Sequence, residues 1–181
     1  MGRVQAGDEA ALGRLMERWE LPVKRLVARM VFNAREAEEL AQETFVRVWL
    51  RRAGFRRGAE FRPWVFAIAV NLARNRLRWW RRRPEVALEE WTQLPDGAGV
   101  GTGVNPKVSP AGELEAGERA AAVRDAIAAL PQDLREAIVL FEYEQLSHAE
   151  IATTVGTTPK AIESRIARAR AKLRPALKRW R

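Results

Sequence analysis

The chain has 181 residues, of which 47% are hydrophobic, so it is long enough for one domain or two small ones and too apolar to be disordered throughout. Lys and Arg total 32 against 23 Asp and Glu, which gives a net charge of +9 and a sequence pI near 11.0. This balance indicates a polyanionic partner, with nucleic acid ahead of an anionic membrane surface. The chain has no Cys and one His, which excludes disulfides, thiolate metal sites and most Ser–His catalytic arrangements.

No stretch of the sequence approaches the ~18 consecutive apolar residues of a membrane-spanning helix. The N-terminus carries Asp8 and Glu9 and has no apolar run, so we expect no secretory signal there. These features predict a cytoplasmic protein that does not insert into a membrane and that needs no cofactor or metal.

Apolar residues that recur every three or four positions predict helices in the N-terminal part of the chain. Asp8 is a good N-cap for the first helix, and Pro22 suits the first turn of a second one. A third helix is predicted over residues 34–52, and a fourth begins at Pro63 after a glycine-containing loop over residues 54–60.

The helical periodicity fails over residues 84–112, and four glycines stand within residues 95–103. Because ordering glycine costs more backbone entropy than ordering other residues, we expect this segment to be a flexible linker. The sequence therefore predicts a first domain over residues 1–83 and a second over residues 113–181.

The second block ends in two capped helices. Ser147 and Glu150 have the spacing of a capping box, and Gly156 suits the left-handed turn after a short helix. Thr158 then caps a last helix with Pro159 at its first position. This pattern is typical of a helix-turn-helix. No strand-like alternation of useful length appears, so the protein is predicted to be all-α, with two small helical domains joined by the linker.

The last helix has one apolar and one polar face. Ile162, Ile166 and Ala169 mark the buried stripe, and the opposite face presents Lys160 and Arg168 with small residues between them. Such a face can approach a major groove, where Lys, Arg and Ser contact base edges or phosphates. Further charge for phosphates flanks it at Arg165, Arg170, Lys172 and Arg174. A solvated basic helix that closes an ordinary bundle is the alternative.

The fourth helix mixes aromatic rings with arginines. Aromatic rings stack on unpaired bases and arginines follow the backbone, so the mixture suits opened single-stranded DNA. Trp64 and Phe66 fit a core role equally well. A polar strip with residues every three or four positions is expected to be exposed, and it consists of Asn71, Arg74, Asn75 and Arg78.

The third helix is acidic in a strongly basic protein. A DNA-binding surface should not carry this charge, so the helix is either solvated or faces a basic protein partner. Its polar residues are Glu36, Glu38, Glu39, Gln42 and Glu43.

Three segments resemble bacterial RNA polymerase sigma factors. Residues 38–49 are similar to the segment that binds the clamp helices of the largest polymerase subunit, and residues 61–72 look like the segment that opens and reads the minus-ten promoter element. Residues 129–173 resemble the C-terminal domain, in which residues 146–152 and 163–170 match the helix-turn-helix that reads the minus-thirty-five element. Only the two outer domains of longer sigma factors are represented, which implies the extracytoplasmic-function subfamily.

The resemblance implies a DNA-binding specificity subunit without catalytic residues. Its partners would be promoter DNA and core RNA polymerase, which it would contact at the clamp helices and at the flap of the second subunit. Whether an anti-sigma factor also binds it is left open. As part of the holoenzyme it would be nucleoid-associated. The implied sites are Glu39, Gln42 and Glu43 for core polymerase; Arg56, Phe61, Arg62, Asn71, Arg74, Asn75 and Arg78 for melting and the minus-ten element; and Thr158, Lys160, Ser164, Arg165 and Arg168 for the minus-thirty-five element.

Two other functions stay open at this point. A helix-turn-helix regulator that acts without polymerase would explain the last helix but not the acidic third helix or the aromatic fourth helix. A sigma-mimicking protein that sequesters an anti-sigma factor would not need the charge of +9 or the basic reading helix. A nucleic-acid enzyme is less favoured, because the sequence has no metal-ligand cluster, P-loop or nucleophile–base pair.

Overall fold

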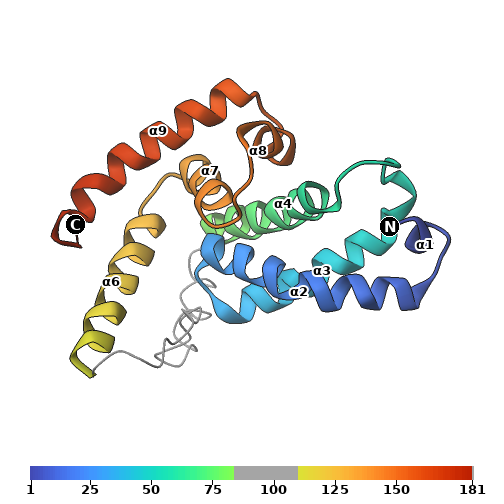
Figure 1. Cartoon of the computed structure of the whole chain (residues 1–181), viewed down its shortest axis with the longest axis horizontal. Helices are drawn as coiled ribbons and strands as arrows, with labels where there is room; N and C mark the ends of the chain where they lie inside the picture. Colours follow the sequence, from blue (N-terminus) through green and yellow to red (C-terminus); the bar gives the residue numbers. More distant parts are fainter. Residues whose placement is uncertain (84–109, 181) are drawn as a thin grey trace.

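The computed structural model describes residues 1–83 and 110–180, and every regular element within these ranges is helical (Figure 1). The all-α prediction is therefore confirmed. The first domain contains α1 (Gly2–Gln5), α2 (Glu9–Val31), α3 (Ala34–Leu50), the short 3₁₀ helix η1 (Arg52–Gly54) and α4 (Phe61–Arg82), and the second contains α6 (Pro110–Ala128), α7 (Gln132–Glu142), α8 (His148–Val155), α9 (Pro159–Ala176) and the 3₁₀ helix η2 (Lys178–Trp180). The expected linker over residues 84–112 lies, up to residue 109, outside the described residues.

The starts of α2 and α3 follow the side-chain caps in the sequence. Asp8 accepts a hydrogen bond from the backbone N–H of Ala11 at 2.8 Å, and Asn33 accepts one from that of Glu36 at 3.0 Å. Each cap satisfies one of the N–H groups that a first helical turn leaves without an internal partner. The predicted boundaries at Asp8 and Asn33 are confirmed.

Two proline positions differ from the prediction. Pro22 does not begin a new helix but lies inside α2, which spans 23 residues from Glu9 to Val31. The lost backbone hydrogen bond costs about 3 kcal/mol, and the burial of Val23, Leu26 and Val27 in the continuing turns offsets it. Pro63 is not the first residue of α4, which begins two residues earlier at Phe61. It still lies in the first turn, where its missing N–H leaves no acceptor unpaired.

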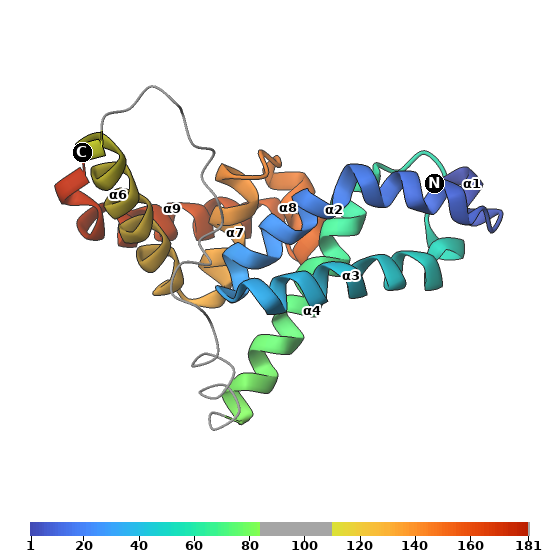
Figure 2. The ribbon, with the colours of Figure 1, turned by 90° about the horizontal axis from the view of Figure 1, so that it is seen from below.

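The first domain packs α2, α3 and α4 around a core of large apolar side chains. Each helix contributes fully buried residues, including Leu26 and Met30 of α2, Phe45 of α3 and Phe66 of α4. The C-terminal half of α4 projects beyond this bundle (Figure 2). Apart from Arg76, which bonds Glu36 of α3, the polar side chains of the projecting half are open to partners other than α2 and α3.

The second domain contains the predicted helix-turn-helix. The Ser147–Glu150 capping box is present, with the Ser147 backbone N–H donating to the Glu150 carboxylate at 2.7 Å. The Ser147 hydroxyl, which donates to the same carboxylate at 2.6 Å, and then the Ser147 backbone N–H lower the pKa of Glu150 below its usual value. Gly156 ends α8 in the left-handed conformation, with φ of 72°, and Thr158 caps α9 by accepting from the Ala161 N–H at 3.2 Å. These features fix the angle at which α9 leaves α8.

The two domains pack against one another. α8 lies along α4 and α7 lies against the C-terminal end of α2, while α9 runs along the outer edge of the molecule (Figures 1 and 2). The buried apolar residues of both domains form one connected cluster. The arrangement therefore brings α4, which the sequence assigns to opened DNA, into contact with the second domain.

Candidate functional site

The polar face of α9 is open to solvent. Lys160, Ser164 and Arg168 are exposed at successive turns, while Ile162 and Ile166 on the other face are buried. Arg168 makes no ion pair with any described residue, and its guanidinium donates only to the Ser164 carbonyl of its own helix at 3.4 Å. The structure thus brings Lys160, Ser164 and Arg168 of the predicted reading residues onto one accessible basic strip.

Two of the arginines expected to flank this strip have partners in their own domain. Arg165 lies 3.5 Å from Asp133 of α7, and Arg170 lies 2.7 Å from Glu142 and over the Phe141 ring. A carboxylate neutralises each guanidinium and holds its position. These two arginines are therefore less available to phosphates than the sequence pattern indicates, whereas Lys172 and Arg174 are exposed.

The polar strip on α4 is partly open and partly covered. Asn71, Asn75 and Arg78 are exposed along about 10 Å of helix, as expected. The exposure predicted for Arg74 is wrong. Its guanidinium forms a two-pronged pair with Glu136 of α7, with Nε to Oε1 at 2.8 Å and Nη2 to Oε2 at 2.5 Å. This pair raises the pKa of Arg74 further above its ordinary value.

The N-terminal end of α4 also meets the second domain. Arg62 donates a hydrogen bond to the backbone carbonyl of Glu144 and lies 3.8 Å from its carboxylate, and Arg29 of α2 lies 3.8 Å from the same carboxylate. Burial raises the pKa of Glu144, and the two arginines act in the opposite direction. Arg62 lies nine residues before Asn71, about two and a half helical turns, so the two residues are on opposite sides of α4 and do not share one strip.

The aromatic residues near the start of α4 pack on one another. The Phe61 ring lies 5.7 Å from Trp19 and 6.0 Å from Trp64, and Trp64 lies 5.0 Å from Phe55. Phe61 is consequently half-buried, and Phe66 is wholly in the core. Arg56 is exposed in the preceding loop. Of the predicted melting residues at this end, only Arg56 is freely accessible.

The polar residues of the acidic helix α3 differ in their exposure to solvent. Glu36 is buried and bonds Arg76 of α4, so its expected exposure is wrong. Glu39 and Gln42 are exposed and Glu43 is half-exposed, with local ion pairs to Arg35 and Arg47 that leave the carboxylates in solvent. Two apolar residues extend this face, and sequence reasoning missed them: Val46 is 50% exposed and Leu50 is 67% exposed. Their helical spacing from Gln42 and Glu43 was the signal that could have shown them.

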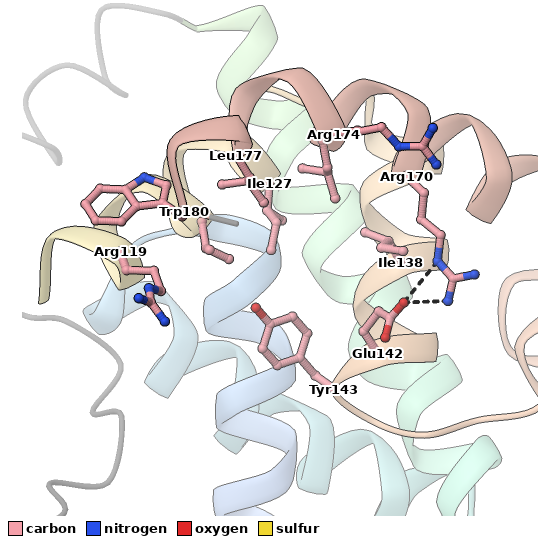
Figure 3. A pocket seen from close by; sticks show the side chains of 11 residues that line it. Arg119, Ile127, Ile138, Glu142, Tyr143, Arg170, Arg174, Leu177 and Trp180 are labelled. Atoms are coloured by element: carbon pink, nitrogen blue, oxygen red, sulfur yellow. Dashed lines mark hydrogen bonds and ion pairs between the residues drawn. The ribbon is translucent and has the colours of Figure 1, made fainter. Parts of the chain in front are cut away.

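A groove runs between α6, α7 and α9 of the second domain (Figure 3). Its volume is ≈ 570 Å³, its floor is apolar, with Ile127, Ile138 and Leu177, and its edge carries Arg170 and Arg174. Figure 3 shows the Arg170–Glu142 pair along one side. A groove of this kind suits an amphipathic helix better than a nucleic acid, because its floor has no cationic group.

Residues 1–83 and 110–180 contain no cluster of His, Asp or Glu arranged to hold a metal ion. The same ranges contain no helix that is long and apolar enough to span a membrane.

Two family matches coincide with the two domains. The family described as sigma-70 region 2 matches residues 15–83, and the family described as sigma-70 region 4 matches residues 120–173. The first range includes α3 and α4, and the second includes the helix-turn-helix with its exposed face.

Characterised relatives align along nearly the whole chain. The RNA polymerase sigma-H factor of Pseudomonas aeruginosa is 34% identical over 178 residues, which cover 97% of this chain and 90% of the relative. The ECF RNA polymerase sigma-E factor of Haemophilus influenzae is 36% identical over 170 residues, which cover 93% and 88%. The sigma-E factor of Escherichia coli is 34% identical over 184 residues, which cover 98% and 94%.

Solved structures share the fold. CnrH, in complex with the cytosolic domain of CnrY, has a TM-score of 0.69 and 25% identity, covering 98% of this chain and 94% of CnrH. The sigma factor RpoE of Bartonella quintana, in complex with the anti-sigma factor NepR, has a TM-score of 0.65 and 20% identity, covering 92% and 96%. The chain therefore belongs to the extracytoplasmic-function branch of the sigma-70 family, the sigma factors that bind core RNA polymerase and direct it to promoters.

Proposed function

We propose that three separate surfaces of this chain carry the steps of promoter-specific initiation. The α3 face with Glu39, Gln42 and Glu43 binds the clamp helices of core polymerase, the α4 surface captures the opened minus-ten strand, and α9 reads the minus-thirty-five duplex. The observation that carries the proposal is the distribution of charge. One chain presents an exposed basic strip on a capped reading helix and, on a different helix, an exposed acidic and apolar face.

The chain acts by binding alone in this proposal. The favourable free energy of its contacts with polymerase and duplex offsets the unfavourable free energy of strand opening. No residue of the chain forms or breaks a covalent bond. We place this activity in the cytoplasm, in association with the nucleoid, because core polymerase and the chromosome are there. Residues 1–83 form the polymerase-binding and minus-ten domain, residues 84–112 the linker and residues 113–181 the minus-thirty-five domain.

The groove of Figure 3 is the proposed place for the flap of the second polymerase subunit. Its apolar floor and arginine edge fit an amphipathic helix with acidic flanks. An anti-sigma partner for this chain stays a prediction from the family resemblance.

The α3 surface is tested with Leu50→Ala. Burial of a large apolar side chain in an interface contributes more than about 1 kcal/mol, so its truncation should weaken binding to core polymerase about fivefold or more. The matched control is Leu21→Ala, which removes another leucine of similar exposure, 52% against 67%, from α2. Affinity is measured by titrating fluorescently labelled protein with core polymerase. Equal affinities of the two variants would contradict the assignment of α3.

A further inference from the structure

The short helix α1 contacts η1 and the start of the loop that leads from η1 to α4 (Figures 1 and 2). The side-chain Nε2 of Gln5 donates a hydrogen bond to the backbone carbonyl of Phe55 at 2.7 Å. No other described residue donates to this carbonyl. Gln5 therefore holds a backbone group that lies 50 positions later in the sequence, immediately before the exposed Arg56.

The position of Gln5 is set by the packing of α1 on the first domain. Its neighbour Val4 is 1% exposed. The Asp8 backbone N–H donates to the Arg3 carbonyl at 3.0 Å, and the Arg3 guanidinium lies 2.7 Å from the carboxylate of Asp8, which also caps α2. The exposed ion pair contributes little, so the burial of Val4 and the backbone bond hold α1 against the start of α2.

The hydrogen bond from Gln5 fixes the peptide unit that joins Phe55 to Arg56. This unit is planar, so holding the Phe55 carbonyl also sets the direction in which the chain enters Arg56. The Phe55 ring is 7% exposed and lies 5.0 Å from the Trp64 ring of α4, so the side chain is held as well. Beyond Phe55, the Ala59 N–H donates to the Arg56 carbonyl at 3.1 Å and closes a turn in the exposed loop over residues 56–60.

We propose that Gln5 is a positioning residue for the capture of opened DNA. By fixing the base of the loop over residues 56–60, it presents Arg56 and Arg57 to the phosphates of the single strand. The inference rests on the proposed function, with Arg56 among the residues that bind the opened strand. The match to sigma-70 region 2 begins at residue 15, so α1 lies outside the residues on which that family match depends.

The physical reason is the population of one loop conformation. An arginine on a loop whose base is held loses less conformational entropy on binding than one on a loop that is free to move. A single hydrogen bond of this kind makes the held conformation about fivefold more populated than it would be without the bond. A strand that binds the held conformation alone therefore loses affinity by about the same factor when the bond is removed.

The test compares Gln5→Met with Gln145→Met. Methionine is close to glutamine in size and has no charge, but it cannot donate a hydrogen bond. Gln145 is a matched control, because its Nε2 also donates to a backbone carbonyl, that of Glu142 at 2.6 Å, in the second domain. Each variant is assembled with core polymerase. The DNA is a promoter selected by transcription from a pooled library, prepared either fully paired or with its minus-ten region unpaired, and anisotropy measures the affinity.

Gln5→Met should weaken binding of the unpaired promoter about fivefold relative to Gln145→Met, with affinity for core polymerase unchanged. If Gln5 acts through the loop, the same substitution should have less than about a twofold further effect in a variant that already carries Arg56→Ala and Arg57→Ala. A merely structural role would lower the affinity for core polymerase and for the unpaired promoter together, and would persist in that variant.

Equal affinities of Gln5→Met and Gln145→Met for the unpaired promoter would overturn the positioning role. A full fivefold loss that persists without the two arginines would overturn it too, and so would an equal loss of affinity for core polymerase. Wild-type binding by the variant with Arg56→Ala and Arg57→Ala would instead show that the loop does not bind the opened strand. That outcome would overturn this part of the proposed function and the positioning role with it.

Discussion

Individual arginines of the second domain differ in what they can bind, although the sequence makes them look alike. Arg168 contacts only its own helix, while Arg170, two residues later, pairs with Glu142 and covers Phe141. A guanidinium already held by a carboxylate releases fewer counterions from DNA than a free one. Affinity for duplex should therefore depend on a subset of the 32 cationic residues.

Arg168→Ala should weaken binding of duplex promoter DNA and reduce the slope of log affinity against log salt by about 0.9 unit, the share of one phosphate contact. The comparison is Arg170→Ala on the same helix. This substitution should change the slope much less, because the Arg170 guanidinium already forms an ion pair with Glu142. Both are measured by anisotropy titrations across a series of salt concentrations. A slope that is the same for wild type and Arg168→Ala would remove Arg168 from the interface.

The helix-turn-helix depends on two local signals at the scale of the element. The capping box begins α8, and Gly156 ends it with a positive φ that a residue with a Cβ atom adopts at a cost. Apart from the two adjacent residues, no atom lies within 4 Å of the place that a Cβ would take, so that cost is one of backbone conformation and not of tertiary steric contact. The orientation of α9 follows from this turn.

Two glycine substitutions should therefore change stability in opposite directions. Gly156→Ala is expected to destabilise the fold by about 1 kcal/mol, because the left-handed conformation penalises a Cβ. Gly117→Ala, in the middle of the exposed helix α6 and equally free of neighbours, should stabilise it by about 0.5–1 kcal/mol. Denaturant unfolding monitored by circular dichroism gives both values. Stabilisation by both substitutions would show that the turn at Gly156 is not formed.

The sequence predicts elements well where a local signal decides the structure. Asp8, Ser147 and Thr158 all cap helices as expected, because capping depends on residues only three positions apart. The interpretation of Pro22 as a helix start was wrong, because burial of the residues after it decides the outcome and burial is a tertiary property. Element boundaries were therefore less predictable than element types.

The exposed residues of the site were predictable from helical periodicity, and their partners in other helices were not. The strip on α9 follows from spacing alone. The pairing of Arg74 with Glu136 joins residues 62 positions apart, and that of Glu36 with Arg76 joins residues 40 apart. A single sequence contains no signal for such contacts, so both residues were expected to be exposed.

The whole molecule combines two domains that pack against one another. Their buried apolar residues form one cluster, and carboxylates of α7 and of the turn after it meet arginines of α2 and α4. In this arrangement the faces of α3 and α9 are open, whereas Arg62 and Arg74 of α4 bond to Glu144 and Glu136.

Transcription in vitro tests the central claim most directly. Core polymerase is incubated with a pooled promoter library in the presence and absence of this protein, and the transcript starts are sequenced. We expect a set of starts that appears only with the protein and shares two spaced upstream motifs, one for α9 and one for α4. An absence of protein-dependent starts, despite tight binding of the protein to duplex DNA, would contradict the account and favour a regulator that acts without polymerase.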